Sequence, residues 1–481
     1  MKWAAIQQLI GLLLMMFSVT ALPPAMVALI AGDGQVVIFL LTFALTAMTG
    51  VALWLPVRGD RGELRTRDGF LVVALFWSVL GVFGAIPFML GPHLGFTDAI
   101  FEAVSGFTTT GATVMTGLDN MPPSVLYHRQ QLQWLGGLGV IVLAVALIPM
   151  LGVGGMALYR AETPGPMKDD KISPRIMHTA RTLWYVYLWL TVACAVCYWL
   201  AGMSAFDAVA HAFSTIATGG YSTHDASLAY YDSVAVEMVA NVFMLLGGIN
   251  FALHFFVWRY RSPRRYLQDT ETRAYLGIVA VATLVIAVTL VVTGAIPNGG
   301  EALRHALLQV ISVITTTGFT TTGFNDWPVY IPLVIAAVGF IGGCAGSTAG
   351  GMKVIRIVLL YKQGTRETFR LIHPRATQPV KLGGKPVAEN VMNSVWGFYT
   401  LYVLSSLVLT GLMMAAGLDL ESAFGAVMAT INLVGPGLGE VASNFKGMPE
   451  MVKWLGIFAM LLGRLEVFTL MVLFTPAFWR H

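Results

Sequence analysis

"ISVITTTGFTTTGF" (residues 311–324) and "SGFTTTGATVMTGL" (residues 105–118) each place three threonines before a glycine in a very apolar chain. Hydrophobic residues make up 56% of the 481 residues, and charged residues only 11%. Soluble domains rarely have this composition, so we predict a protein that lives in a bilayer. The two polar stretches therefore need a reason to stand where hydrocarbon is expected.

Long apolar stretches run through the whole sequence. A helix needs about 20 such residues to cross a bilayer, and about ten stretches qualify. Lys2 ahead of the first one also fits a signal peptide, but the apolar run continues past Pro24, which is too long for a signal core. The predicted spans are residues 5–30, 35–57, 70–91, 127–151, 180–202, 233–259, 273–297, 328–361, 391–416 and 452–479.

Basic residues are distributed unevenly between the connections. Most of the 29 lysines and arginines lie at 58–67, 160–181, 259–273 and 353–385, or at the two ends of the chain. The alternate connections carry only Arg304 and Lys446. Because basic loops stay on the cytoplasmic side, we predict that both termini are cytoplasmic. The small net charge of +4 argues against nucleic acid as a partner.

Four segments share a glycine at one point of a repeating pattern: "FTTTGAT" (107–113), "TIATGGY" (215–221), "ITTTGFT" (314–320) and "INLVGPG" (431–437). Aligning them puts Gly111, Gly219, Gly318 and Gly435 in one register, with a period of roughly one hundred residues. A second landmark follows each of these glycines within a span, at Gly136-Gly137, Gly247-Gly248, Gly342-Gly343 and Gly463-Arg464. Two landmarks in the same order indicate four copies of one structural unit.

A short helix-like run precedes each of the four glycines. An acid near its start would offset the positive end of the helix dipole, and the four acids are Asp98, Asp207, Glu301 and Glu421. About a dozen apolar residues cannot cross a bilayer, so we expect re-entrant helices that enter from outside and return. Backbone that turns at membrane depth is tolerated where it lines a cavity, so four such returns predict a shared one.

We therefore predict an all-α polytopic membrane protein. Four membrane-pore-membrane repeats surround a pseudo-fourfold pore, and two extra transmembrane helices precede them. The predicted units are residues 1–68 for the N-terminal helix pair, 69–170 for repeat 1, 171–268 for repeat 2, 269–385 for repeat 3 and 386–481 for repeat 4.

The four glycine turns predict a cation filter. Glycine adopts positive φ without steric penalty, so a short segment can turn successive carbonyls toward one axis. Rings of carbonyl oxygens replace the water of a monovalent cation, and threonine hydroxyls, or Asn432 in repeat 4, can add ligands. The predicted filter residues are Thr109, Thr110, Gly111, Ala217, Thr218, Gly219, Thr316, Thr317, Gly318, Asn432, Val434 and Gly435.

The stretch "GFIGGCAGSTAGGMKVIR" (residues 339–356) interrupts an expected inner helix with six glycines. A packing face of small residues is one interpretation, because Gly339 with Gly343, and Gly346 with Gly350, have the required spacing. A broken helix is the one we favour, because broken backbone at membrane depth lines a pore. The predicted gating loop comprises Cys344, Ala345, Gly346, Ser347, Thr348, Ala349, Gly350 and Gly351.

Arg464 lies near the middle of the last span, where an unpaired charge costs several kcal/mol. Its register equals that of the second glycine in the other repeats, so we predict that it faces the pore. A structural ion pair, for instance with Glu466 acting on another helix, is the alternative.

The chain resembles the Trk/Ktr/HKT superfamily of potassium transporters, and within it the TrkH type. The motifs that carry the resemblance are "TTTGAT", "IATGGYST", "ITTTGFTTTGF", "NLVGPG", the glycine-rich stretch and "GRLEVFTL". The resemblance implies K⁺ as the transported ion, held at Thr110, Thr218, Thr317 and Val434, with Arg464 in the pore. It also implies a bacterial inner membrane as the location, a homodimer, and a cytoplasmic nucleotide-binding regulatory ring of the TrkA type.

An enzyme is not indicated, because the sequence lacks the common hydrolase motifs, and we expect no organic cofactor. A Na⁺- or proton-coupled secondary transporter that uses buried carboxylates remains the alternative, with Glu237 and Glu466 as candidates. Neither the strictness of K⁺ over Na⁺ nor the choice between channel and symport follows from these residues.

Overall fold

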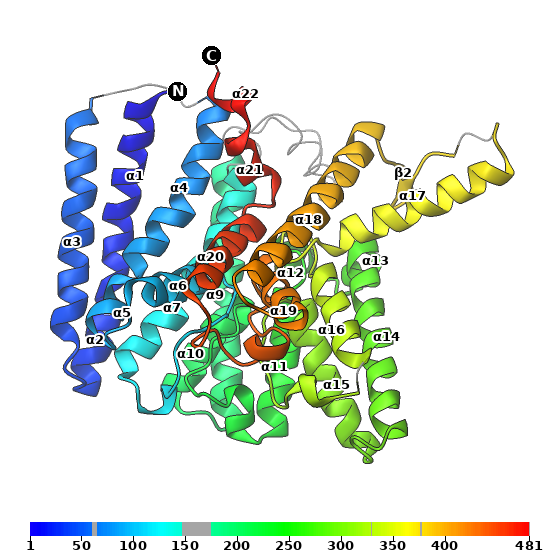
Figure 1. The fold of residues 1–481 in the computed structure, drawn as a ribbon, viewed down its shortest axis with the longest axis horizontal. Coiled ribbons are helices and arrows are strands. Elements are labelled where there is room, and N and C mark those ends of the chain that lie inside the picture. Colours follow the sequence, from blue (N-terminus) through cyan, green and yellow to red (C-terminus); the bar gives the residue numbers. More distant parts are fainter. Residues whose placement is uncertain (60–64, 147–174, 329, 376–377, 481) are drawn as a thin grey trace.

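The computed structural model describes residues 1–59, 65–146, 175–328, 330–375 and 378–480, and these residues form a helical body (Figure 1). Within this part of the chain the sheet structure is one hairpin of two short strands, β1 (Lys381–Leu382) and β2 (Lys385–Pro386). The predicted all-α class is therefore confirmed.

Two N-terminal helices pack side by side at one edge of the body (Figure 1). The first runs through α1 (Trp3–Ser18), η1 (Val19–Ala21) and α2 (Leu22–Ala31), and the second through α3 (Val36–Trp54) and η2 (Leu55–Val57). A Cβ atom on Gly11 would lie 2.8 Å from the Gly50 carbonyl oxygen, so glycine at this crossing allows the two backbones to touch.

The rest of the chain repeats one order of elements: a long helix, a short helix, a turn and a second long helix. The first helices are α4 (Thr66–Gly84) with α5 (Ile86–Leu90), α9 (Arg175–Leu200), α14 (Thr270–Val292) and α18 (Glu389–Ala415). The short helices are α6 (Phe96–Phe107), α10 (Ala205–Ile216), α15 (Gly299–Ile314) and α19 (Leu420–Ile431). The four predicted acids lie in the first turns of these short helices.

The second helices differ from one another. They are α7 (Pro123–Ala146), α11 (Val234–Gly247) followed by α12 (Phe251–Tyr260), α16 (Tyr330–Ile341) followed by α17 (Val354–Ile372), and α20 (Glu450–Arg464) followed by α21 (Phe468–Met471) and η8 (Val472–Phe474). Smaller elements lie in the connections: η3 (Leu118–Asn120), η5 (Ser227–Tyr231), α13 (Arg264–Gln268), η6 (Phe324–Asp326), η7 (Gly439–Val441) and α22 (Pro476–Trp479).

Contacts between the units close into a ring. Each short helix packs on the first helix of its own unit, as α6 on α4, α10 on α9, α15 on α14 and α19 on α18. The second helix of each unit packs on the short helix of the next: α7 on α10, α11 on α15, α16 on α19, and α20 back on α6. This cyclic order is what a pseudo-fourfold arrangement requires, although the exact unit boundaries remain predictions.

The number of continuous apolar helices is smaller than predicted. Six helices are long and apolar enough to cross a membrane, or up to eight if the two bent pairs each count as one span, among the residues that the structure describes. The expected spans at 127–151 and 328–361 fall outside this count. Arg129 and three glutamines lie in the first of them, and the second is broken after Ile341.

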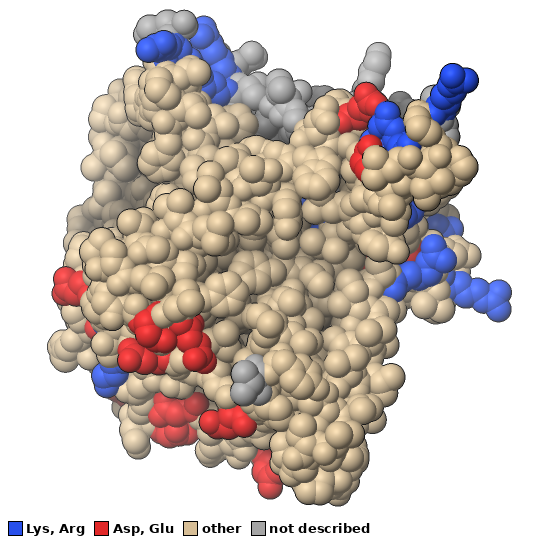
Figure 2. Space-filling model, turned by 45° about the vertical axis from the view of Figure 1, so that its right-hand side comes forward, with Lys and Arg blue, Asp and Glu red and all other residues tan. Residues whose placement is uncertain are grey.

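The charges divide along the length of the body. Figure 2 shows lysine and arginine gathered mainly at the end that carries α17, and most of the visible aspartate and glutamate at the opposite end. Both termini lie at the first of these ends (Figure 1). Part of the predicted basic connection at 160–181 falls outside the described residues.

Candidate functional site

The four turns after the short helices share one backbone conformation. In each turn two residues separated by one position have positive φ: Thr109 and Gly111, Thr218 and Gly220, Thr316 and Gly318, and Leu433 and Gly435. The residue between them donates its N–H to a carbonyl five positions earlier, pairing Thr110 with Ser105, Gly219 with Ser214, Thr317 with Ser312 and Val434 with Ala429. The turns are thus four copies of one motif.

This geometry corrects the predicted alignment of repeat 2. The residue equivalent to Gly111, Gly318 and Gly435 is Gly220, not Gly219, because Gly220 has the matching φ of 77°. Gly219 takes the place of Thr110, Thr317 and Val434, and Thr218 takes the place of Thr109. The sequence "ATGGY" offers two adjacent glycines, and the letters alone did not distinguish them.

The turns meet one another around a common centre. A Cβ atom on any of the four positive-φ glycines would run into the carbonyl of the neighbouring turn. Gly111 would meet Gly219 O, Gly220 would meet Thr317 O, Gly318 would meet Val434 O, and Gly435 would meet Thr110 O at 2.9 Å. The same Cβ on Gly111 would lie 3.7 Å from Thr317 O, which belongs to the opposite turn. We call these four oxygens, of Thr110, Gly219, Thr317 and Val434, the carbonyl ring.

The threonine side chains mostly bond within the protein. Thr110 Oγ1 lies 2.7 Å from Thr108 Oγ1, and Thr317 Oγ1 lies 2.7 Å from Thr315 Oγ1, so each hydroxyl is tied to the end of its own short helix. Both ends of the Asn432 amide are also used, because Oδ1 accepts a hydrogen bond from Tyr402 and Nδ2 donates to Met428 O. The prediction that Asn432 takes the role of a threonine ligand in repeat 4 therefore finds no geometric support.

The glycine-rich stretch is a loop, not a helix. It connects α16 to α17, and Gly342, Gly346 and Gly351 all have positive φ. A Cβ atom on Gly350 would overlap Asn432 O, so the loop passes directly beside a filter turn. The small residues therefore allow both the break in the helix and the close approach of the loop backbone to the turn.

Two of the turns, those of repeats 2 and 3, hold this loop by hydrogen bonds. Thr348 Oγ1 donates to Ile216 O at 3.0 Å and accepts from Thr218 Oγ1 at 3.1 Å. Gly350 N donates to Thr316 Oγ1 at 2.6 Å. The positive-φ threonines of repeats 2 and 3, Thr218 and Thr316, therefore point away from the carbonyl ring and toward the loop. Thr109 of repeat 1 instead packs beside Gly136 on α7.

A buried acid, Glu271, binds the start of the loop and the start of α17, which follows the loop. Glu271 Oε1, at the start of α14, accepts from Ala345 N at 2.7 Å and from Ile355 N at 3.1 Å. Cys344 N donates to Gly248 O at 2.9 Å, where α11 breaks into α12. The breaks in repeats 2 and 3 are therefore built against each other.

Arg464 contacts the loop and is buried. Nη1 donates to Thr348 O at 3.0 Å, Nη2 to Gly136 O at 3.4 Å, and the guanidinium lies 5.4 Å from the centre of the Trp77 ring. Glu466 pairs instead with Arg356, with 2.7 Å between Nη2 and Oε2. The alternative of a structural ion pair between Arg464 and an acid thus finds no partner among the described residues.

The two candidate proton carriers are both paired with arginine. Both carboxylate oxygens of Glu237 accept hydrogen bonds from Arg304, at 2.6 and 2.7 Å, and Glu466 accepts one from Arg356. Each of these two acids therefore has an arginine partner that holds its side chain in place.

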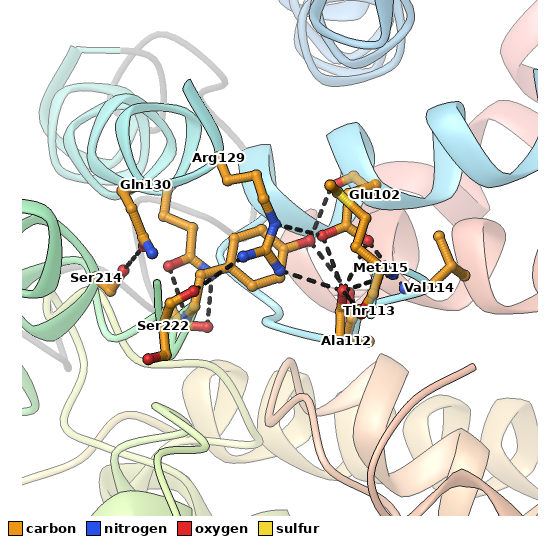
Figure 3. Close-up of polar contacts among 12 residues, drawn as sticks. Glu102, Ala112, Thr113, Val114, Met115, Arg129, Gln130, Ser214 and Ser222 are labelled. Carbon is orange, nitrogen blue, oxygen red and sulfur yellow. Dashed lines mark hydrogen bonds and ion pairs between the residues drawn. The ribbon is translucent and has the colours of Figure 1, made fainter. Parts of the chain in front are cut away.

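A polar network behind the filter was missed from the sequence (Figure 3). Arg129 Nε lies 2.8 Å from Glu102 Oε1, and its Nη1 donates to Ser222 O at 3.0 Å. Glu102 also accepts from Thr113 Oγ1 and Val114 N, at 3.0 and 2.9 Å. The pair is fully buried and joins a short helix, α7 and the extended segments that follow two of the turns. The run "RQQLQ" at 129–133 inside an expected span was the available signal.

A buried ring of carbonyls, closed by four similar units of apolar helices, defines the class of a membrane protein that handles bare monovalent cations. Comparisons with known proteins agree with this class. The sequence model of the TrkH family, described as a cation transport protein, matches residues 35–481, and the chain belongs to that family.

The relatives cover the whole chain. The Trk system potassium uptake protein TrkH of Halomonas elongata is 51% identical over 482 residues, covering 100% of both chains. The Trk system potassium uptake protein TrkG of Escherichia coli is 41% identical, covering 98% of this chain and 97% of that one. The crystal structure of the potassium transporter TrkH from Vibrio parahaemolyticus matches with a TM-score of 0.93 and 49% identity over 100% of both chains. The chain is thus a transporter and not an enzyme.

Proposed function

We propose that this protein takes up K⁺ across the bacterial inner membrane through a cation-selective pore whose filter is the carbonyl ring. The closure of four equivalent turns on one another carries this proposal, because it gathers four oxygens within the reach of one ion. The ends of the four short helices point their negative dipoles to the same place, which favours a cation and repels anions.

K⁺ sits, in this proposal, between the oxygens of Thr110, Gly219, Thr317 and Val434, with Thr218 replaced by Gly219 in the predicted set. The other predicted filter residues shape the turns: Thr109, Gly111, Ala217, Thr218, Thr316, Gly318 and Gly435, together with Asn432, which is bonded to Tyr402. The names of the relatives, which are potassium uptake proteins, favour K⁺ as the physiological ion.

The loop at 344–351 acts as the gate. It lies against the turns of repeats 2, 3 and 4, and Arg464 adds a fixed positive charge under it. An ion leaving the ring toward the basic end of the molecule must pass both. Opening then requires the Thr348 and Gly350 hydrogen bonds to break.

The cytoplasm lies at the basic end, with both termini. A TrkA-type nucleotide-binding ring on that side, and a second copy of this chain beside it, complete the assembly. The resemblance to TrkH-type subunits and the projecting basic helix α17 with its hairpin favour this arrangement (Figure 1).

Uptake of ⁸⁶Rb⁺ into proteoliposomes tests the proposal, with K⁺, Na⁺, NH₄⁺ and choline as competitors. We expect K⁺ to compete well ahead of Na⁺, and choline not to compete. Removing residues 345–350 should raise uptake in the absence of any partner. Selective uptake that depends on a proton gradient and is lost in Glu466→Gln, but not in Gly318→Ser, would instead support the coupled transporter.

A further inference from the structure

One oxygen of the carbonyl ring is bonded to a side chain of a different repeat. Gln133 on α7 is fully buried, and its Nε2 donates to Gly219 O at 2.7 Å. Its Oε1 accepts from Tyr221 N at 3.1 Å. The amide therefore spans the turn of repeat 2 and uses both of its ends there.

Repeat 2 also differs from the others in lacking a side chain at the ring position, where Gly219 stands in place of Thr110, Thr317 and Val434. Gly219 does not have positive φ, so its backbone does not require glycine. A Cβ atom there would lie 2.6 Å from Gln133 Oε1 and 2.7 Å from Nε2. The Gln133 amide occupies the space that a side chain on residue 219 would need.

The second helix of repeat 3 shows the opposite exchange of volume. Gly136, Gly247 and Gly463 each face the end of their own short helix, which sets a common register. Three residues before Gly247 and Gly463 lie the buried residues Met244 and Met460, where repeat 1 has Gln133. In repeat 3 the aligned residue is Gly339, and a Cβ atom there would lie 3.6 Å from Val434 Cγ2. A small residue on the helix thus faces a large one in the turn, and the reverse holds for Gln133 and Gly219.

We propose that Gln133 is a positioning residue of the filter, which fixes the direction of the Gly219 carbonyl and so sets K⁺ over Na⁺ discrimination in the second quadrant. The inference rests on the proposed ion pathway. Two successive glycines, Gly219 and Gly220, leave this peptide free to rotate, whereas repeats 1 and 3 tie their turns by threonine pairs. A carbonyl oxygen has two lone pairs, so the Gln133 bond leaves one for the ion.

Ion-dependent thermal stabilisation of the purified full-length chain tests this without an open gate. K⁺ or Na⁺ is titrated against choline at constant ionic strength, since a bound ion raises the stability of the folded state. Gln133→Leu keeps the volume and removes the donor, and we expect the ratio of half-maximal Na⁺ to K⁺ concentrations to fall roughly three- to tenfold, the value of one hydrogen bond. Gln131→Leu is the control, because the Gln131 amide donates to Thr20 O at 3.0 Å, on the N-terminal helices.

A volume exchange separates positioning from simple loss of structure. Gly219→Ala alone should lose the K⁺ preference through collision with the amide, and Gly219→Ala with Gln133→Ala should regain part of it. An unchanged ratio in Gln133→Leu, or a double variant no better than Gly219→Ala, would overturn the inference while the parent stays selective. A parent without K⁺ preference would overturn the proposed function, and the inference with it.

Discussion

The four filter turns are nearly identical in backbone, whereas the four helices that follow them are not. All four turns repeat the same φ pattern and the same five-residue hydrogen bond. Of the helices, α7 runs unbroken to the end of its described part, α11 and α20 end at bends of 97° and 110°, and α16 ends at the glycine-rich loop. An ion at the axis needs equal oxygens on four sides, but a gate needs only one movable segment. Symmetry is therefore kept at the proposed ion ligands and lost at the proposed gate.

Removing the ion pair behind the filter should have the largest effect on that symmetry. We expect Glu102→Gln to destabilise the protein by about 3–5 kcal/mol, because it leaves Arg129 buried without its charge partner. The measurement is the unfolding midpoint in detergent. Asp98→Asn is the matched control, since Lys453 and Asp98 form an ion pair at 2.6 Å in which the Asp98 side chain is 29% exposed. Equal shifts of the unfolding midpoint in the two variants would show that the buried Glu102–Arg129 pair contributes no more to stability than an exposed pair.

Alanine at Gly220 should break one quadrant of the ring. Positive φ and collision with Thr317 O together should cost about 3 kcal/mol and abolish the K⁺ preference. Gly117→Ala provides the comparison, because Gly117 has a φ of 76° and nothing within 4 Å of the added atom. It should cost only about 1 kcal/mol. If Gly220→Ala keeps the K⁺ preference, then Gly219 and not Gly220 is the residue equivalent to Gly111, Gly318 and Gly435.

Loss of the Thr348 hydroxyl should loosen the asymmetric part. Thr348→Val removes the bonds to Ile216 O and Gly247 O, at 3.0 and 3.2 Å, and should raise ⁸⁶Rb⁺ uptake without a partner about tenfold. Thr410→Val is the control, because the Thr410 hydroxyl donates to Ser406 O of its own helix. If uptake is the same in both, the loop is packing and not a gate.

Neutralising Arg464 should have a smaller effect, roughly threefold more uptake. Arg464→Gln keeps a donor for Thr348 O and removes the charge from the path. Arg356→Gln serves for comparison, since Arg356 pairs with Glu466 away from that oxygen. Unaltered flux together with a lower unfolding midpoint would make Arg464 structural.

The smallest effect is expected on the outer face, where His224 bridges repeats 1 and 2. Its hydrogen bond to Asp119, at 2.6 Å, lowers the pKa of that carboxyl from 3.8. A carboxyl whose pKa is lowered in the folded state stabilises the protein when the pH is above its ordinary pKa. This stabilisation is lost as the pH falls through the folded-state pKa. Asp119→Asn should therefore lower the unfolding midpoint slightly at pH 6, and by less at pH 3. Because the Asp119 side chain is 44% exposed, the effect stays that of a surface pair. A larger difference at pH 3 than at pH 6 would reverse this assignment.

The predictions are correct where the same local chemistry recurs along the chain. Acids at four helix starts, threonine-glycine turns and a cluster of glycines each have one physical reason, and the reason can be recognised in a few adjacent letters. The errors arose where two readings share the same letters. Gly219 and Gly220 are both glycines, and only the φ angles show which one takes the strained position. Asn432 resembles a ligand in the alignment, but Tyr402 on another helix takes its amide oxygen.

The sequence by itself determined the membrane class, the repeating unit, the glycine turns and the broken helix, because hydropathy and backbone freedom are properties of neighbouring residues. The tertiary structure alone decided the register of repeat 2, the arginine partners of Glu102, Glu237 and Glu466, and the contact of Gln133 with Gly219. These depend on residues tens to hundreds of positions apart that meet only when four units close into a ring. A buried polar group must find its partner in space, and its position along the chain does not say which one.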